Sequence, residues 1–148
     1  MPSKPPTVAD LVWLGDLRFA ATLHRPASAK GDRAGGSSEL VIDSAGIAGP
    51  SPVEALGLSL AGCMSIDVAH ILTRGRHPFR ALRSHLVADR APDNPHRVVR
   101  ATLHLVVEGD VPPEAVERAI ALSRDKYCSV WHSLRPDIVL TVTCDVHA

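Results

Sequence analysis

Aromatic side chains are scarce in this sequence, which has two tryptophans, two phenylalanines and one tyrosine among its 148 residues. Proteins that bind single-stranded nucleic acid stack bases on aromatic side chains, so the shortage argues against that class. Net charge is also lacking, because sixteen basic residues balance sixteen acidic ones. No field of one sign then favours nucleic acid or an anionic membrane. We expect neither as a partner.

Cysteine is sparse as well, and Cys63, Cys128 and Cys144 are an odd number without the spacing of a disulfide framework. Small secreted domains depend on such frameworks, whereas thiols in the cytoplasm stay reduced. The first ten residues, MPSKPPTVAD, contain no apolar segment of the kind that a signal peptide needs. These absences predict a cytoplasmic protein.

Metal-binding motifs are missing too, although the chain has eight histidines. No CxxC or HExxH sequence is present, and the histidines and cysteines do not form the paired groups of a zinc knuckle. His85 and His104 fall in strand-like segments, where surface positions are expected. We therefore predict no metal site.

The longest apolar run, residues 51–74, predicts a helix. Ser51, Pro52 and Glu54 are typical of a helix start, with Ser51 as the N-cap and Glu54 closing a capping box. Gly75 supplies an end signal. Apolar residues lie on nearly every side of this helix, which is the pattern of a helix buried in a protein core.

A membrane span is the alternative interpretation of the same run, since about 20 apolar residues are enough to cross a bilayer. The run carries Glu54, Asp67 and His70, however, and ionisable side chains are rare and costly inside a membrane. We therefore interpret residues 51–74 as a core helix of a soluble protein.

Short alternating segments on both sides of this helix predict strands. Residues 15–16 join the first two strands as a hairpin. A second helix begins within residues 111–114, and residues 127–131 continue it or begin a new turn. The predicted strands are residues 11–14, 17–23, 40–42, 79–90, 97–108 and 138–146, with loops at residues 26–38, 43–50 and 91–96.

Strands interrupted by isolated helices are typical of an α+β fold rather than a parallel βαβ series. The strands at residues 79–90 and 97–108 are expected to pair antiparallel, with alternate residues from 99 to 107 on the apolar face. The length suits one domain, residues 1–148, with a flexible polar tail at residues 1–6.

Two cysteines are candidate nucleophiles, although either one alone also fits a core position, since free cysteine packs as a small hydrophobe. Cys63 lies near the middle of the predicted helix. Cys128 lies in a charged stretch beside Arg124 and Lys126, and cationic neighbours lower the pKa of a thiol and make it reactive. Cys144 has no such neighbours in its terminal strand, and we interpret it as structural.

Two motifs and their spacing carry a family resemblance. Residues 51–63 have the pattern Ser-Pro-x-Glu-(x)8-Cys, and residues 126–130 read Lys-Tyr-Cys-Ser-Val, followed by a closing strand. Over residues 8–147 the sequence resembles the OsmC/Ohr family of osmotically induced and organic hydroperoxide resistance proteins. The resemblance implies an α+β, OsmC-like fold with antiparallel sheets around the long buried helix and a second, C-terminal helix. It also implies an intertwined homodimer with two sites near the subunit interface.

The same resemblance implies a thiol peroxidase. Cys63 would be the thiolate that attacks the O–O bond of an organic hydroperoxide, and Cys128 would resolve the resulting sulfenic acid as a disulfide. A dithiol of the lipoyl type would reopen that disulfide. No metal, flavin or haem cofactor would be needed.

The family activates its reactive cysteine with an arginine that a glutamate orients. In this chain Val53 occupies the position of that glutamate, counted back from Cys63, and Glu54 lies one residue later. One residue turns a helical side chain by about 100°, so Glu54 fits a capping box better than a catalytic role. Arg18 is the preferred candidate for the arginine, ahead of Arg25.

Asp67 and His70 lie about one and two turns beyond Cys63, on the same side of the predicted helix. A carboxylate near a thiol opposes thiolate formation unless a cation pairs with it. We interpret both residues as hydrogen-bonded, buried polar groups, with Arg74 as a further candidate partner of Asp67.

Three roles stay open at this point. The first is the peroxidase, and the second is an OsmC-like protein that binds a small apolar or thiol-reactive ligand without efficient turnover. The third is a structural role with both cysteines in the core, which requires their sulfur atoms to lie far apart. The distance between the two sulfurs separates the third role from the others.

Overall fold

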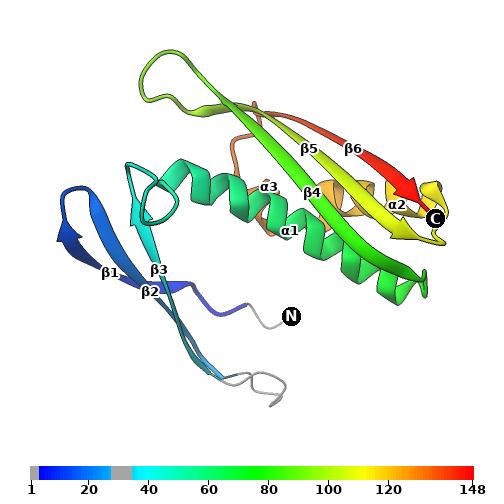
Figure 1. Cartoon of the computed structure of the whole chain (residues 1–148), viewed down its shortest axis with the longest axis horizontal. Coiled ribbons are helices and arrows are strands. Elements are labelled where there is room, and N and C mark those ends of the chain that lie inside the picture. Colours follow the sequence, from blue (N-terminus) through cyan, green and yellow to red (C-terminus); the bar gives the residue numbers. More distant parts are fainter. Residues whose placement is uncertain (1–3, 28–34) are drawn as a thin grey trace. The chain divides into compact units, whose positions relative to one another are not determined.

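The computed structural model describes residues 4–27 and 35–148 and confirms the predicted α+β fold (Figure 1). The chain divides into two compact units between Ala55 and Leu56. Each unit contains a three-stranded sheet. The predicted tail at residues 1–6 and the predicted loop at residues 26–38 lie partly outside the described residues. The assignment of residues 1–148 to one domain stays a prediction.

The sheet of the N-terminal unit is antiparallel, with the order β1-β2-β3. Its strands are β1 (Val8–Gly15), β2 (Arg18–Arg25) and β3 (Gly36–Asp43). The predicted hairpin joins β1 to β2, and positive φ angles at Gly15 (106°) and Asp16 (49°) turn the backbone there.

β3 is longer than the predicted strand at residues 40–42. Its ladder with β2 runs from Gly36, opposite Arg25, to Asp43, opposite Arg18. Hydrogen bonding to β2 therefore draws the polar start of β3, which has no apolar alternation, into the sheet.

Asp43 ends β3 and organises the loop that follows. Its carboxylate accepts backbone hydrogen bonds from Ala45 (3.0 Å), Ile47 (3.2 Å) and Ala48 (2.9 Å). The bond from Ala48 is the largest of the causes that hold the pKa of Asp43 below its usual value. One buried carboxylate thus fixes the loop that leads into the long helix.

α1 (Pro52–Arg74) begins with the predicted capping box. The backbone N–H of Ser51 donates to Glu54 Oε2 at 2.7 Å, and the backbone N–H of Glu54 donates to Ser51 Oγ at 3.4 Å. The helix ends where it was predicted to end, but the left-handed residue of the end signal is Arg76 (φ 58°) rather than Gly75.

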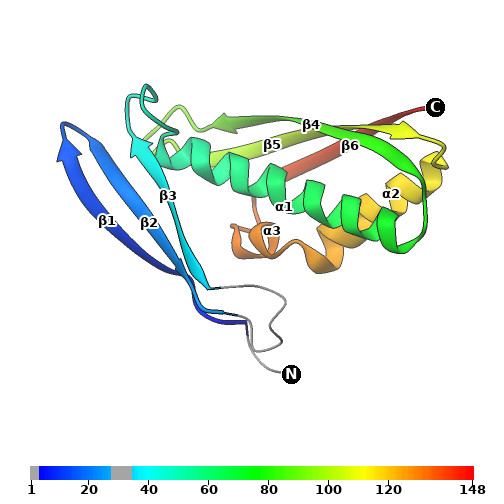
Figure 2. The same cartoon turned by 60° about the horizontal axis from the view of Figure 1, so that its bottom comes forward.

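The C-terminal unit packs helices against one face of its sheet (Figures 1 and 2). Its strands have the order β4-β5-β6; α1 precedes β4 along the chain, and the other helices follow β5. The elements after α1 are β4 (Phe79–Arg90), β5 (Val98–Gly109), α2 (Pro113–Leu122), a π-helical turn (Ser123–Tyr127), α3 (Ser129–Ser133) and β6 (Val139–His147).

The pairing of β4 with β5 is antiparallel, as predicted, but the pairing of β5 with β6 is parallel. The prediction of antiparallel sheets is therefore wrong for this pair. The chain leaves the end of β5, returns through α2 and α3, and enters β6 in the direction of β5. Such a helical crossover gives a parallel pair.

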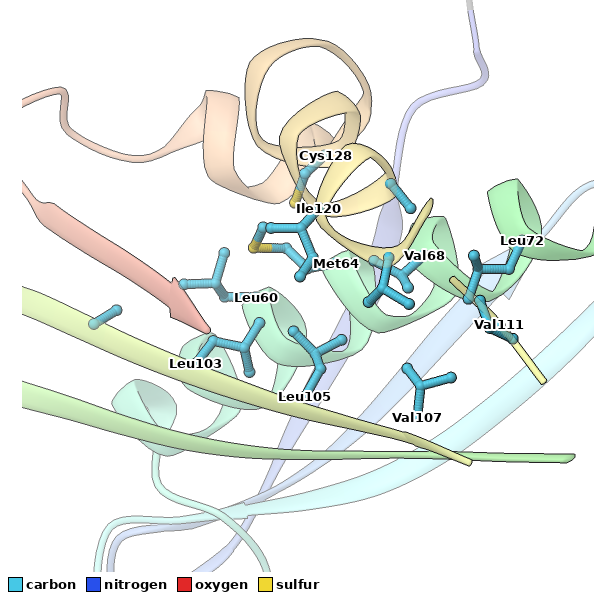
Figure 3. Packing of buried hydrophobic residues seen from close by; sticks show 13 residues of the cluster. Leu60, Met64, Val68, Leu72, Leu103, Leu105, Val107, Val111, Ile120 and Cys128 are labelled. Carbon is cyan, nitrogen blue, oxygen red and sulfur yellow. The ribbon is translucent and has the colours of Figure 1, made fainter. Parts of the chain in front are cut away.

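The core of the C-terminal unit lies between α1, α2 and β5 (Figure 3). α1 contributes a stripe at every fourth residue, which is one face of a helix. β5 contributes alternate residues, as its pattern predicted. The buried side chains of these elements are Leu60, Met64, Val68 and Leu72 from α1, Ala101, Leu103, Leu105 and Val107 from β5, and Val116, Ala119 and Ile120 from α2.

The other faces of α1 differ from the prediction of a helix buried on every side. Leu58 is 65% exposed and Ile66 is 69% exposed in the single chain. α1 is long and apolar enough to cross a membrane, with a mean hydropathy of 1.6. Its buried stripe nevertheless packs against β5 and α2, as in a core helix. Gly57 of α1 allows a close approach of β4, because a Cβ atom on Gly57 would lie 3.1 Å from the side chain of Leu86.

Candidate functional site

The candidate site lies where α1 meets the turn between the π-helical segment and α3. Cys63 and Asp67 are four residues apart on α1 and therefore share one side of the helix. Cys128 approaches them from the other element. Its backbone N–H closes the π-helical turn by donating to the carbonyl of Ser123 at 2.8 Å. The chain then leaves the helical conformation at Cys128, which places its side chain at the start of α3.

The two sulfurs lie close together. Cys63 Sγ, Cys128 Sγ and a carboxylate oxygen of Asp67 all lie within 4.8 Å of one another. A disulfide has an S–S bond of about 2.05 Å, so the sulfurs would need to approach by less than about 3 Å. The purely structural role required distant sulfurs, and the observed geometry contradicts it.

The two cysteines have different surroundings. Cys63 is half-buried, and its Sγ atom lies 3.9 Å from the hydroxyl oxygen of Ser129. Cys128 is 0% exposed and lies beside Ile120 and Met64 in the core (Figure 3). A molecule from solvent therefore reaches Cys63 before it reaches Cys128.

Burial is the main cause that raises the pKa of Cys128 to about 11, and the neighbouring Cys63 and Asp67 contribute to the same rise. The backbone N–H of Trp131 donates to Cys128 Sγ at 3.4 Å and acts in the opposite direction. The prediction that basic neighbours activate Cys128 is therefore wrong.

The basic residues next to Cys128 have other partners. Arg124 pairs with Asp125 at 3.0 Å, and the amine of Lys126 lies 5.3 Å from the ring centre of Tyr127. The π-helical turn thus directs the side chains of Arg124 and Lys126 away from the thiol of Cys128. The sequence pattern did not predict this turn.

Asp67 is held by a residue that the sequence did not single out. The buried hydroxyl of Ser123 donates to Asp67 Oδ2 at 2.8 Å. This serine, rather than Arg74, is the observed partner; the predicted hydrogen bonding of Asp67 is confirmed, and its side chain is half-buried rather than buried. His70 is exposed, and the prediction of a buried histidine is wrong. The sequence feature that could have identified Ser123 is its place as a polar residue at a core-facing position of the predicted second helix.

Comparisons with known proteins identify the family. The family model described as OsmC-like protein matches residues 43–143. The chain belongs to the OsmC-like family. Protein YhfA of Escherichia coli K12 is 34% identical over 119 residues, which are 80% of this chain and 89% of YhfA.

Solved structures share this OsmC-like fold. A hypothetical protein from Aquifex aeolicus VF5 superposes with a TM-score of 0.79 at 24% identity, covering 97% of each chain. An organic hydroperoxide resistance protein OsmC from Legionella pneumophila superposes with a TM-score of 0.67 at 12% identity, covering 98% of this chain and 100% of the other. These likenesses show that the fold is shared.

The other two predicted site residues of this OsmC-like protein lie in the N-terminal unit. Arg18 is in β2, and its guanidinium lies 3.5 Å from the carboxylate of Asp16. Glu54 closes the capping box at the start of α1. The observed contact of Glu54 with Ser51 confirms its capping role. The catalytic roles of Arg18 and Glu54 stay predictions.

Cys144 lies on β6, where it is half-buried and packs against the core of the OsmC-like fold. Burial is the main cause that raises its pKa. This environment is in keeping with the structural role that the sequence predicted for Cys144. It also makes Cys144 a suitable control position for experiments on the other two cysteines.

Proposed function

We propose that this OsmC-like protein is a thiol-dependent peroxidase that reduces organic hydroperoxides through Cys63 and Cys128. The observation that carries the proposal is the approach of the two sulfurs to within 4.8 Å, with one half-buried and one fully buried. Two thiols with unequal access to solvent suit a reaction in which the accessible sulfur reacts with the substrate and the buried sulfur then reacts with the sulfenic acid formed on the first.

The reaction proceeds in three steps. The thiolate of Cys63 attacks an oxygen of the hydroperoxide, the O–O bond breaks, and the leaving alkoxide takes a proton to become an alcohol. Cys63 is now a sulfenic acid. The sulfur of Cys128 attacks that sulfenic sulfur, water leaves, and a disulfide forms. A dithiol then reduces the disulfide and is itself oxidised to a cyclic disulfide, which returns both cysteines to thiols.

The surroundings of the two sulfurs support this order of events. Cys63 is partly accessible and has the hydroxyl of Ser129 at 3.9 Å, which is a potential donor to a thiolate. Cys128 is fully buried, and its pKa is raised to about 11, so few thiolates are present at neutral pH. Proximity to Cys63 compensates for this low intrinsic reactivity, because the attack is intramolecular.

The exposed apolar residues of α1 support the expectation of a homodimer. Leu58 and Ile66 are 65% and 69% exposed in the single chain, on the faces that do not pack against β5. Large apolar side chains exposed on a helix are a feature that association with a second chain would bury. Light scattering on the purified protein would give twice the chain mass for a dimer and would contradict this part of the proposal with a monomer mass.

The setting of the proposed enzyme follows from its composition. A protein with no net charge and few aromatic residues has no evident affinity for nucleic acid or an anionic membrane. We propose a cytoplasmic enzyme whose partners are a hydroperoxide and a dithiol or lipoyl-bearing reductant, and that needs no bound cofactor for turnover.

A second candidate function is binding of a small thiol-reactive ligand without efficient turnover. Asp67 favours it, because this carboxylate lies within 4.8 Å of both sulfurs and contributes to the raised pKa of the Cys128 thiol. Val53 in place of the family glutamate favours it as well. Slow hydroperoxide reduction together with stable adducts at Cys63 would select this function over the peroxidase.

Hydroperoxide consumption tests the proposal. Reduced protein is mixed with cumene hydroperoxide and dihydrolipoamide, and the remaining hydroperoxide is measured over time. Cys63→Ser is expected to lower the rate to the uncatalysed level, whereas the matched control Cys144→Ser is expected to keep the rate of the unmodified protein. Full activity in Cys63→Ser would rule the proposal out.

A further inference from the structure

The side chains of Cys63, Asp67 and Cys128 form a group of donors that the peroxidase reaction does not use in full. The reaction needs the two sulfurs, but it gives no role to the carboxylate of Asp67, which lies within 4.8 Å of both. We propose that the reduced protein binds a thiophilic divalent cation, of which Zn²⁺ is the main representative, through Cys63 Sγ, Cys128 Sγ and Asp67. This inference goes beyond the proposed function and does not depend on it.

The donor atoms are already close to a coordinating arrangement. All three lie within 4.8 Å of one another. Around tetrahedral zinc, Zn–S bonds of about 2.3 Å and Zn–O bonds of about 2.0–2.2 Å place the donors about 3.5–3.8 Å apart. Metal binding therefore requires each pair of donor atoms to approach by about 1 Å, which side-chain rotation supplies.

The donor types suit zinc and similar cations. Two thiolates and one carboxylate bring three negative charges to a divalent ion, and thiolate sulfur selects against magnesium and calcium. Cys63 and Asp67 come from adjacent turns of a single rigid helix, and Cys128 comes from the start of α3. Three protein donors leave a fourth coordination position for water or a ligand, as at a catalytic zinc site.

Buried hydrogen bonds orient two of the three donors. Ser123, which is 0% exposed, donates to Asp67 Oδ2 at 2.8 Å and leaves the other carboxylate oxygen for a cation. The backbone N–H of Trp131 donates to Cys128 Sγ at 3.4 Å. Outer hydrogen bonds of this kind fix the direction of metal ligands and raise metal affinity.

A bound cation would also give an electrostatic reason for the position of the Asp67 carboxylate beside two thiols. Three negative groups within 4.8 Å repel one another when both thiols are ionised. A divalent cation between them reverses that balance, because it is the largest charge in the site and favours the ionised form of every ligand. The metal and the disulfide use the same sulfurs, so the two states exclude each other.

Cobalt titration of the full-length protein tests the site directly. Chelator-stripped, reduced protein is titrated with Co²⁺ under anaerobic conditions, and Zn²⁺ is then added. We expect one Co²⁺ per chain, thiolate-to-cobalt charge-transfer absorption, and visible bands of tetrahedral cobalt that Zn²⁺ abolishes. Metal binding is measured without hydroperoxide, so its failure and a failure of the peroxidase proposal are distinguishable.

Variants assign the ligands. Cys63→Ser and Cys128→Ser are each expected to remove part of the charge-transfer absorption and to weaken binding, and Cys144→Ser is the matched control that keeps both. Asp67→Asn keeps an acceptor for Ser123 and weakens Co²⁺ binding without loss of charge-transfer intensity per bound ion. Ser123→Ala should lower affinity about 10–100-fold through the orientation of Asp67.

Two results would overturn the site. One is the absence of charge-transfer absorption at stoichiometric Co²⁺, and the other is a spectrum that stays unchanged in Cys63→Ser or is lost in Cys144→Ser. Circular dichroism checks that each variant is folded. Because Cys63 is half-buried, its serine variant decides the question even if substitution of the buried Cys128 unfolds the chain.

Discussion

The burial of Cys128 gives a quantitative prediction for its alkylation. Iodoacetamide reacts with the thiolate form of cysteine. A pKa of about 11 instead of 9.0 lowers the thiolate fraction at pH 8 from about 10% to about 0.1%, roughly 100-fold. The side chain is also 0% exposed, so the reagent needs an opening of the site before it reaches the sulfur. We therefore expect labelling of native Cys128 at least 100-fold more slowly than in the denatured chain.

Peptide mapping by mass spectrometry measures this difference. The reduced protein is labelled at pH 8 with a metal chelator present, quenched at intervals and digested, and the same protein in concentrated guanidinium chloride serves as the control. Cys63 reports on the partly accessible thiol in the same sample. Labelling of Cys128 at similar rates in the native and denatured protein would refute the assignment of a buried, proton-retaining thiol.

Three further predictions concern stability. Met64→Ala should lower the free energy of unfolding by about 2–5 kcal/mol through lost burial and a residual cavity. As a control, substitution of the exposed Thr73 on the same helix by alanine should change the free energy of unfolding by less than about 0.5 kcal/mol. Urea denaturation measures both variants, and equal effects would contradict the assignment of Met64 to the core. Ser51→Ala should cost about 0.5–2 kcal/mol in the same assay by removing the side-chain cap of α1, and an unchanged midpoint would contradict that role. Folding raises the pKa of Cys128 from 9.0 to about 11, so the native state holds this proton more tightly than the unfolded chain. The contribution of this thiol to the free energy of unfolding is fully present below about pH 9 and is lost as the pH rises towards about 11. The dependence of stability on pH in this range should be flatter in Cys128→Ala, and an identical pH profile in this variant would count against the prediction.

Much of the fold follows from local patterns. The alternation of β5 identifies its buried residues, and the capping residues Ser51 and Glu54 locate the start of α1. These features depend on neighbours in sequence, which a pattern records directly. The parallel pairing of β6 depends instead on the path of α2 and α3, and no pattern within β6 distinguishes it from an antiparallel strand.

The candidate site was predictable only in part. Cys63 and Cys128 were identified by type, motif and spacing, and the structure brings their sulfurs together. The hydrogen bond between Asp67 and Ser123 joins residues 56 positions apart and depends on the π-helical turn. That turn also buries Cys128, so its charged neighbours in sequence gave the wrong direction for its pKa. Tertiary packing overrode the local pattern at this position.

Disulfide formation in a single turnover tests the proposed peroxidase most directly. Reduced, metal-free protein is treated with one equivalent of cumene hydroperoxide and no reductant, then alkylated, digested and mapped by mass spectrometry. The account predicts one equivalent of alcohol and a Cys63–Cys128 disulfide, with Cys144 remaining a thiol; in Cys128→Ser it predicts a sulfenic acid at Cys63. Hydroperoxide that stays unconsumed while both thiols remain reduced would contradict the account.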